Sequence, residues 1–139
     1  MRIMAIDYGD AHTGVAVSDP TGFLTGDVTT IHSRKAEVVL EELSKLVQTY
    51  QVDELVMGFP RNMDGTEGPR AELYRTFAGQ VEEATGLKPV LWDERRTTVD
   101  AHRILFDAGK NGKKRKKTVD AVAASLILEG YLEFRRMRG

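Results

Sequence analysis

The feature that most constrains the fold is a change of rhythm along the chain. Three apolar, strand-like segments come first, at 2–8, 14–18 and 23–31, and short turns join them. The turn Asp19-Pro20-Thr21-Gly22 is typical of such a connection, because Pro fixes φ and Gly accepts a positive φ. Consecutive strands with short connections form an antiparallel meander. Helical and strand-like patterns alternate after that, which indicates an α/β domain.

The remaining elements follow from apolar periodicity. Apolar residues at helical spacing predict helices over 39–50, 70–84, 97–108 and 118–136. Short apolar runs predict strands at 54–59, where Pro60 ends the run, and at 89–92. The order βββ-α-β-α-β-α-α is that of a ribonuclease H-like fold. We therefore expect one domain over residues 1–139, with a mixed five-stranded sheet of three antiparallel meander strands and two parallel strands, flanked by helices.

Composition excludes several classes of protein. The 139 residues suit about one domain, and 41% apolar with 29% charged residues is an ordinary globular composition. The chain has no cysteine, so disulfides, thiolate zinc sites and cysteine nucleophiles are excluded. No apolar stretch is long enough to cross a bilayer, and the first residues lack the pattern of a signal peptide. We therefore expect a cytoplasmic protein with no membrane partner.

Charge is distributed unevenly along a chain whose net charge is only −1. Residues 1–69 hold 5 Lys and Arg against 11 Asp and Glu, whereas residues 70–139 hold 15 against 10. Six of the eight residues from 110 to 117 are basic. We expect this run to form a loop before the last helix. It is either a surface for a polyanion or an ordinary solvated loop, and charge alone does not separate the two.

Carboxylates lie where strands and helices meet. Asp7 ends the first strand, Asp93 and Glu94 follow the fifth, and Asp120 opens the last helix. Ligands of open sheets collect beyond the strand ends, where these acids can meet. Clustered carboxylates need cations, and their hard oxygen atoms suit two Mg²⁺ or Mn²⁺ ions, as in phosphodiester hydrolysis.

Each of these acids also has an ordinary structural interpretation. Asp7 can accept hydrogen bonds within its own turn. The acids at 93–94 can form surface ion pairs with the arginines at 95–96, and Asp120 can oppose the helix dipole. The acids are persuasive only as a group.

Histidine and aromatic residues give weaker signals. His12, His32 and His102 are far apart in sequence and form no zinc-binding pair, so His32 and His102 are interpreted as surface residues. His12 follows Asp7 closely enough to contact a phosphate. Tyr8 and Trp92 could stack on bases, although Trp92 belongs to a strand that looks central and is better explained as core.

Four motifs, in this order along the chain, resemble those of one known family over nearly the full length. They are Asp7-Tyr8-Gly9 with 14–19 (Gly-Val-Ala-Val-Ser-Asp), 58–66 (Gly-Phe-Pro-Arg-Asn-Met-Asp-Gly-Thr), 93–98 (Asp-Glu-Arg-Arg-Thr-Thr) and 119–124 (Val-Asp-Ala-Val-Ala-Ala). Each is weak alone, but the set is specific. The chain is similar to the YqgF (RuvX) family, whose members are described as Holliday junction resolvases and as nucleases for the 5′ end of pre-16S ribosomal RNA.

The resemblance implies a ribonuclease H-like nuclease with a role in ribosome biogenesis. By motif position, Asp7, Glu94 and Asp120 match the catalytic acids, with Asp7 bridging two ions and each of the others holding one. Asp93 is a fourth ligand or a group that supports the others. The substrate is then structured RNA or branched DNA. The RNA is above all pre-16S rRNA, and ribosomal particles that contain it are further partners. The oligomeric state is left open.

Basic residues near these acids are expected to neutralise phosphates. They are Arg95, Arg96, Lys113, Lys114, Arg115, Lys116 and Lys117. Many relatives carry Arg or Lys in the turn after Asp7, where this chain has Ala11-His12-Thr13. His12 would contact a phosphate more weakly than those residues, which lowers the expected affinity for substrate more than it affects the metal chemistry.

Two rival functions use the same residues. Asp7-Tyr8-Gly9 with Gly14 also suits the phosphate loop of actin-like ATPases and kinases, but those proteins enclose a nucleotide between two such domains. Alternatively, the chain is a non-catalytic module that binds RNA or a protein through its basic run. Saturable ATP binding would favour the first rival. Biological activity that survives loss of the Asp7 charge would favour the second.

Overall fold

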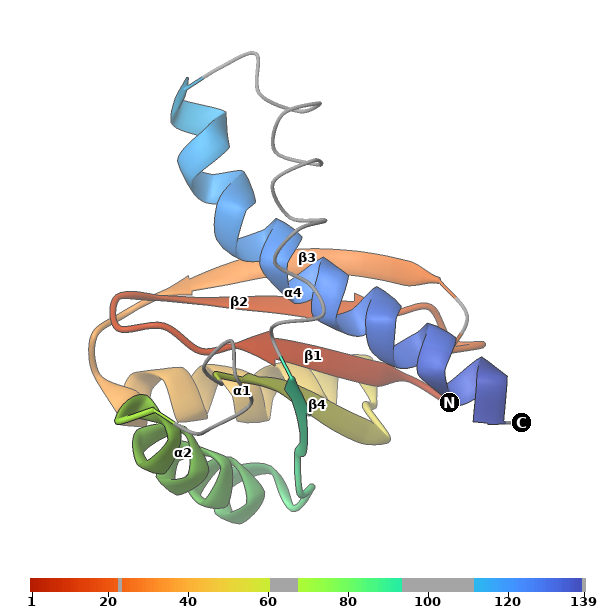
Figure 1. The fold of residues 1–139 in the computed structure, drawn as a ribbon, viewed down its shortest axis with the longest axis horizontal. Helices are drawn as coiled ribbons and strands as arrows, with labels where there is room; N and C mark the ends of the chain where they lie inside the picture. The colour runs from red at the N-terminus through yellow and green to blue at the C-terminus, as the bar shows by residue number, and fades with distance from the viewer. Residues whose placement is uncertain (23, 61–67, 94–111, 139) are drawn as a thin grey trace.

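The computed structural model describes residues 1–22, 24–60, 68–93 and 112–138, and for 112–121 and 138 it describes the backbone alone. The elements, in chain order, are β1 (Ile3–Asp7), β2 (His12–Ser18), β3 (Thr25–His32), α1 (Ala36–Tyr50), β4 (Glu54–Phe59), α2 (Arg70–Thr85), β5 (Val90–Asp93) and α4 (Gly112–Arg138). The helix predicted over 97–108 and most of the loop at 61–68 lie outside the described residues. Every other predicted element is present (Figure 1).

The strands form one mixed sheet in the order β3-β2-β1-β4-β5. β1, β2 and β3 pair antiparallel as a meander, while β4 is parallel to β1 and β5 is parallel to β4. The prediction of three meander strands and two parallel strands is therefore confirmed. One detail was wrong: the strand that carries Trp92 is at the edge of the sheet. Trp92 is nevertheless buried, because a helix covers that edge strand.

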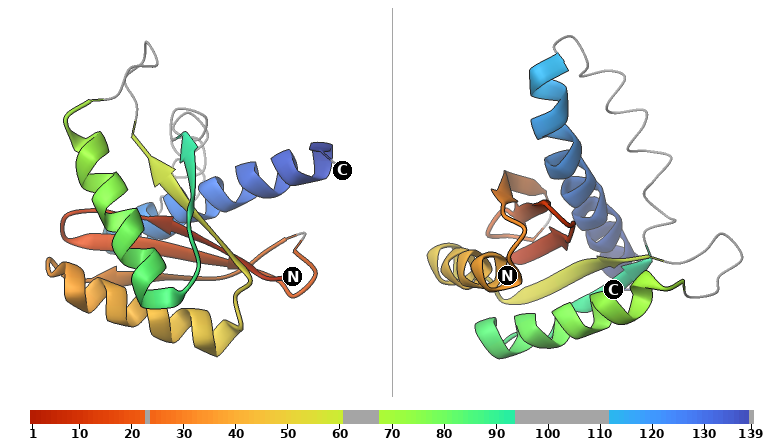
Figure 2. Two further views of the ribbon diagram at one scale, coloured as in Figure 1. Left: turned by 90° about the horizontal axis from the view of Figure 1, so that it is seen from below. Right: turned by 90° about the vertical axis from the view of Figure 1, so that its left-hand side faces the viewer.

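Helices cover both faces of the sheet. α1 and α2 lie together on one face, and α4 crosses the other face diagonally (Figures 1 and 2). Strand residues divide between the two faces in strict alternation. In β1, Met4 and Ile6 join the core beneath α1 and α2, whereas Ile3 and Ala5 join the core beneath α4. This alternation decides which face each site residue can serve.

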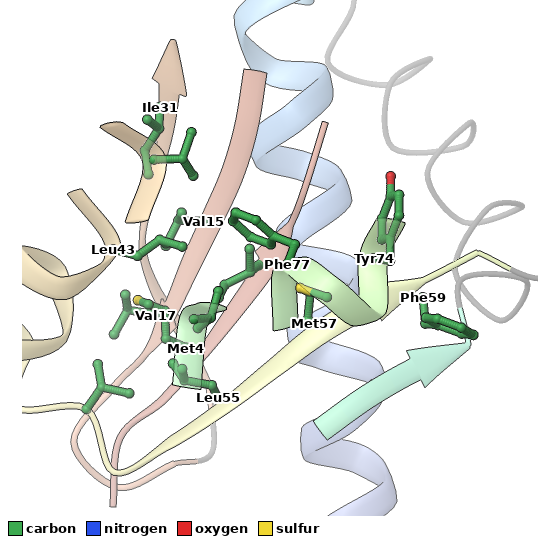
Figure 3. Close-up of a cluster of buried hydrophobic side chains, with 14 of the residues drawn as sticks. Met4, Val15, Val17, Ile31, Leu43, Leu55, Met57, Phe59, Tyr74 and Phe77 are labelled. Atoms are coloured by element: carbon green, nitrogen blue, oxygen red, sulfur yellow. The ribbon is translucent and has the colours of Figure 1, made fainter. Parts of the chain in front are cut away.

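The larger core lies beneath α1 and α2. Figure 3 shows aliphatic side chains of several strands meeting Leu43 of α1 and Phe77 of α2. α2 presents Ala71, Tyr74, Phe77 and Val81 to this core, and it ends at Gly86, whose φ of 79° is the left-handed conformation that glycine favours. Leu73, which the spacing pattern places on the apolar side, is instead 47% exposed. Tyr74 takes its place because a helix repeats about every 3.6 residues: Tyr74, three residues before Phe77 and seven before Val81, lies nearer the centre of this face than Leu73, eight residues before Val81.

α4 is longer than the sequence predicts. It begins at Gly112 and not near Thr118, so the basic run at 113–117 is helical and not a loop. Lys and Arg are good helix formers and no Pro or Gly interrupts the run after Gly112, so local propensity outweighs the repulsion between like charges. The first turns of α4 project beyond β3, on the side of the molecule toward which β1 and β3 run, and the helix ends on the opposite side, where both termini lie (Figure 1). Within the described residues, no helix combines the length and the apolar character needed to span a membrane.

The smaller core lies between the sheet and α4. The Trp92 ring meets Tyr131 and Phe134 edge-on, with ring centroids 5.8 and 5.6 Å apart. The Tyr131 hydroxyl donates a hydrogen bond of 2.5 Å to Glu54, and Arg135 forms an ion pair with the same carboxylate. Burial, and next the hydrogen bond with Glu54, raises the pKa of Tyr131 above its usual value of 10.0.

The loss of folding stability at alkaline pH should reveal the contribution of Tyr131. Because folding raises its pKa, the stabilising contribution of the neutral phenol is complete below pH 10 and is lost as pH rises above 10, where the unfolded chain ionises first. We expect Tyr131→Phe to lose less stability than wild type over this alkaline range, in urea unfolding followed by circular dichroism. Tyr8 and Tyr50, whose pKa values are also raised, titrate in both proteins and cancel in the comparison. Parallel losses in the two proteins would contradict the expectation.

Candidate active site at the carboxyl ends of the strands

The ends of three parallel strands bring two of the predicted acids to one edge of the sheet. β1, β4 and β5 run in the same direction and end at Asp7, Phe59 and Asp93. Each acid ends its strand because an apolar run gives way there to polar residues. The two strands that carry Asp7 and Asp93 therefore end at a common edge of the sheet.

Asp7 lies on the face that α4 covers. It follows Ala5 by one full alternation of β1, and Ala5 is fully buried in the core beneath α4. Asp7 itself is half-buried. A half-buried carboxylate at the end of a strand is suited to hold a ligand at the sheet edge.

Two glycines flank Asp7 on the neighbouring strands. Gly14 of β2 is its direct pairing partner, and the β1–β4 register, continued by one residue past Ile6 and Met57, places Gly58 on the other side. Both glycines are buried. No side chain from these strands therefore crowds the carboxylate on this face, which is the usual meaning of glycine inside a strand. We did not predict this pair, although strand-interior glycine is a signal that the sequence contains.

Asp93 lies apart from Asp7. β4 separates β1 from β5, so their strand axes are about 10 Å apart. Asp93 is also paired with Phe59, which belongs to the core beneath α1 and α2, so it serves the opposite face from Asp7. On that face the Arg75 guanidinium lies 5.0 Å from the centre of the Phe59 ring. The structure thus brings Asp7 and Asp93 to one edge but not to one face.

The structure describes the other predicted acids only in part. Glu94, Arg95 and Arg96 lie outside the described residues, and Asp120 is described by its backbone in α4. Asp120 lies one helical turn before Ala124, a fully buried residue that shares a core with Ala5. Within the described side chains, no group of three His, Asp or Glu residues could hold a metal ion.

Tyr8 is anchored beside the site. Its ring stacks on Phe77, with centroids 3.8 Å apart and planes 8° from parallel, and the Tyr74 hydroxyl donates a 2.8 Å hydrogen bond to its carbonyl oxygen. Burial, followed by the charge of Asp10, raises the pKa of the Tyr8 hydroxyl. One face of the ring is therefore committed to the core. Trp92, the other candidate for base stacking, is only 8% exposed.

The turn after β1 is tight. A Cβ on Gly9 would lie 2.4 Å from the carbonyl oxygen of His12, which only glycine avoids. His12 is exposed, as is its pairing partner His32 on β3, and their rings meet edge-on with centroids 4.9 Å apart. The sequence gives no sign that His32 lies beside His12, because twenty residues separate the two and only the strand register brings them together.

Comparison with solved structures defines the class of this fold. The chain is similar to T. thermophilus RuvC in complex with a Holliday junction substrate, with a TM-score of 0.62 and 12% identity, covering 98% of this chain and 96% of that one. This likeness confirms the ribonuclease H-like fold of RuvC-type resolvases.

Sequence comparison identifies the family within that class. The model of the RuvX family, described as Holliday junction resolvase, matches residues 1–134. A protein of Carboxydothermus hydrogenoformans is 44% identical over 135 residues, and one of Clostridium botulinum is 47% identical over 133 residues; this chain and those proteins cover each other by 96–98%. Both are named "Putative pre-16S rRNA nuclease". The chain belongs to the RuvX family.

Proposed function

We propose that this protein is a divalent-metal-dependent nuclease that hydrolyses phosphodiester bonds, with the 5′ end of pre-16S ribosomal RNA as its substrate. The observation that carries the proposal is the half-buried Asp7 at the end of β1, on the face of α4 and between two glycines. The names of relatives at 44–47% identity support the choice of substrate. A cytoplasmic location and action on ribosomal particles belong to the same proposal.

Asp120 is positioned to approach Asp7. Ala5 and Ala124 share a buried core. Asp7 lies two residues beyond Ala5, about 6.6 Å along the strand, and Asp120 lies four residues before Ala124, about 6 Å along the helix. Both steps lead toward the side of the molecule on which β1 ends, because α4 begins on that side (Figure 1). We therefore assign both acids to one site.

Glu94 is assigned as the third acid. Asp93 serves the opposite face of the sheet, which leaves the next residue in sequence as the better partner for Asp7. Asp93 then has an indirect role at the end of β5. Three carboxylates supply hard oxygen donors that suit Mg²⁺ or Mn²⁺ better than softer metals. When bound, such ions activate the attacking water and stabilise the charge that develops on the phosphate.

The chain's own groups perform the remaining tasks. Asp7, Glu94 and Asp120 would hold the ions, and the basic first turns of α4, at 113–117, would bind the phosphates of the substrate. Arg95 and Arg96 would act in the same way next to Glu94. Glycines 14 and 58 leave space for the scissile phosphate to approach Asp7.

The test is direct cleavage of two labelled substrates by the full chain. Pre-16S leader RNA and a four-way DNA junction are incubated side by side with Mn²⁺ and with EDTA. We expect RNA to be cut in Mn²⁺ and not in EDTA. Cutting of the junction alone would favour the second candidate function, that of a Holliday junction resolvase. The similarity of this fold to that of RuvC supports this candidate. Salt-sensitive binding without any cutting would favour a non-catalytic binding module.

A further inference from the structure

We propose that a second phosphate-binding surface lies where β2 begins and β3 ends. It consists of His12, His32, Arg34 and Lys35, which we call the β2–β3 corner. The proposal rests on the proposed nuclease function and extends it: the corner holds the substrate strand on the side of Asp7 away from β4 and β5. The ligand is the phosphodiester backbone of a nucleic acid.

The corner and Asp7 share one edge of the sheet. β3 is antiparallel to β2, which is antiparallel to β1, so β3 and β1 end at the same edge. His32 ends β3, two strands from Asp7, a lateral distance of about 10 Å. A nucleic-acid strand that lies along this edge with one phosphate at Asp7 therefore continues over the corner.

Backbone contacts hold the corner in place. The Ser33 amide donates a 3.0 Å hydrogen bond to the carbonyl oxygen of Ala11, which ties the end of β3 to the start of β2. The Lys35 amide donates to the Ser33 hydroxyl at 3.1 Å and fixes the next turn. The close approach of Gly9 to His12 fixes the other side, two residues after Asp7. The cationic residues are thus kept at a constant offset from Asp7.

The charges of the corner are available. Arg34 and Lys35 are exposed, and neither has a carboxylate partner in the part of the chain that the structure describes. Lys45, in contrast, lies 3.5 and 3.6 Å from Glu41 and Glu42. Residues 1–69 hold only 5 Lys and Arg against 11 Asp and Glu. Two adjacent cations without such partners are therefore unusual in this half of the chain.

The nearby acids do not cancel these charges. Asp10, in the turn between β1 and β2, forms an ion pair of 3.2 Å with Arg70. Glu37, in the first turn of α1, is exposed, and among the described residues it forms no ion pair with Arg34 or Lys35. The imidazole N–H of His32 adds a hydrogen-bond donor beside the two full charges. A phosphate backbone fits this set of groups.

Binding measurements with charge-matched variants test the proposal. Fluorescence anisotropy of labelled single-stranded pre-16S leader RNA is measured in EDTA, which prevents metal-dependent cleavage. Arg34→Gln/Lys35→Gln is compared with Lys45→Gln/Lys88→Gln, which removes the same charge from the outer side of α1 and from the residues that precede β5. We expect the corner variant to bind about tenfold more weakly and its salt slope to fall by about 1.4, because each phosphate contact contributes about 0.7. The control should change affinity less than about twofold.

The outcomes separate this proposal from the nuclease function. If wild type cuts RNA in Mn²⁺ but the corner variant binds as tightly as the control, the corner is not a phosphate site and the nuclease function stands. If wild type binds but does not cut, and the corner variant still binds more weakly than the control, the corner stands and the nuclease function fails. Equal loss in both variants would mean a general charge effect and would overturn the corner, as would the absence of salt-sensitive binding by wild type.

Discussion

Asp7→Asn should abolish metal-dependent RNA cleavage while the fold and RNA binding persist. Asparagine has nearly the shape of aspartate, so it fits the half-buried position between Gly14 and Gly58, but it removes the negative charge that would hold the metal ions. Loss of a residue that merely supports a metal ligand typically costs 10–100-fold, so loss of a direct ligand should cost more than about 100-fold. Single-turnover cleavage of leader RNA in Mn²⁺ measures the rate, and anisotropy in EDTA measures binding.

Asp10→Asn is the matched control for this substitution. It makes the same chemical change three residues away, at an exposed acid whose ion pair with Arg70 lies at the surface. Surface ion pairs contribute at most about 1 kcal/mol, so cleavage should change less than about fivefold. Asp120→Asn should match Asp7→Asn if both acids belong to one site. Wild-type cleavage by Asp7→Asn would contradict the proposed site, and equal losses in Asp7→Asn and Asp10→Asn would point to folding as the cause.

Elements whose signals are local were predicted closely from the sequence. β4 covers Glu54–Phe59 as predicted, because a short apolar run stops at Pro60, which cannot continue a sheet ladder. The end of α2 was predicted because Gly86 adopts the left-handed conformation at a helix end. The antiparallel meander followed from connections too short for a crossover. In each case the determining residues are neighbours in sequence.

Features that depend on distant residues were not predicted correctly. The place of β5 at the sheet edge depends on which strand it pairs with, which its own sequence does not record. The start of α4 at Gly112 was missed for a different, local reason: helix propensity and charge repulsion within the basic run have opposite signs and similar size. The contact between His12 and His32 exists only through the β2–β3 register.

The candidate site shows the same division. The acids could be named from the sequence because each ends a strand or opens a helix. The face of the sheet on which each acid lies could not be predicted, because the face of a strand residue depends on which residue starts the alternation. The structure places Asp7 on the same face of the sheet as Ala5, and Asp93 on the other face with Phe59. The assignment of Glu94 and Asp120 as partners of Asp7 therefore stays a prediction, for which the cleavage assay is the test.

Trp92→Ala should lower the free energy of unfolding by about 3–5 kcal/mol, the usual cost of removing a large buried aromatic side chain. Trp92 is 8% exposed and is the principal contact between the edge strand β5 and α4. The structure makes room for the indole ring at Gly130, where a Cβ would lie 3.3 Å from the ring. Removal of the indole ring would also remove its aromatic contacts with Tyr131 and Phe134. Urea unfolding followed by circular dichroism measures the change.

The neighbouring Leu91 provides the control that separates core packing from a contact with bases. Leu91 is 39% exposed on the other face of β5, so Leu91→Ala should cost clearly less than Trp92→Ala. Trp92→Phe keeps an aromatic ring against α4 and should recover part of the stability. If Trp92 stacked on nucleic acid instead, Trp92→Ala would weaken RNA binding in EDTA and leave unfolding near wild type. Because β5 leads directly into Asp93 and Glu94, loss of its anchor to α4 should also reduce cleavage under conditions where the variant is still folded.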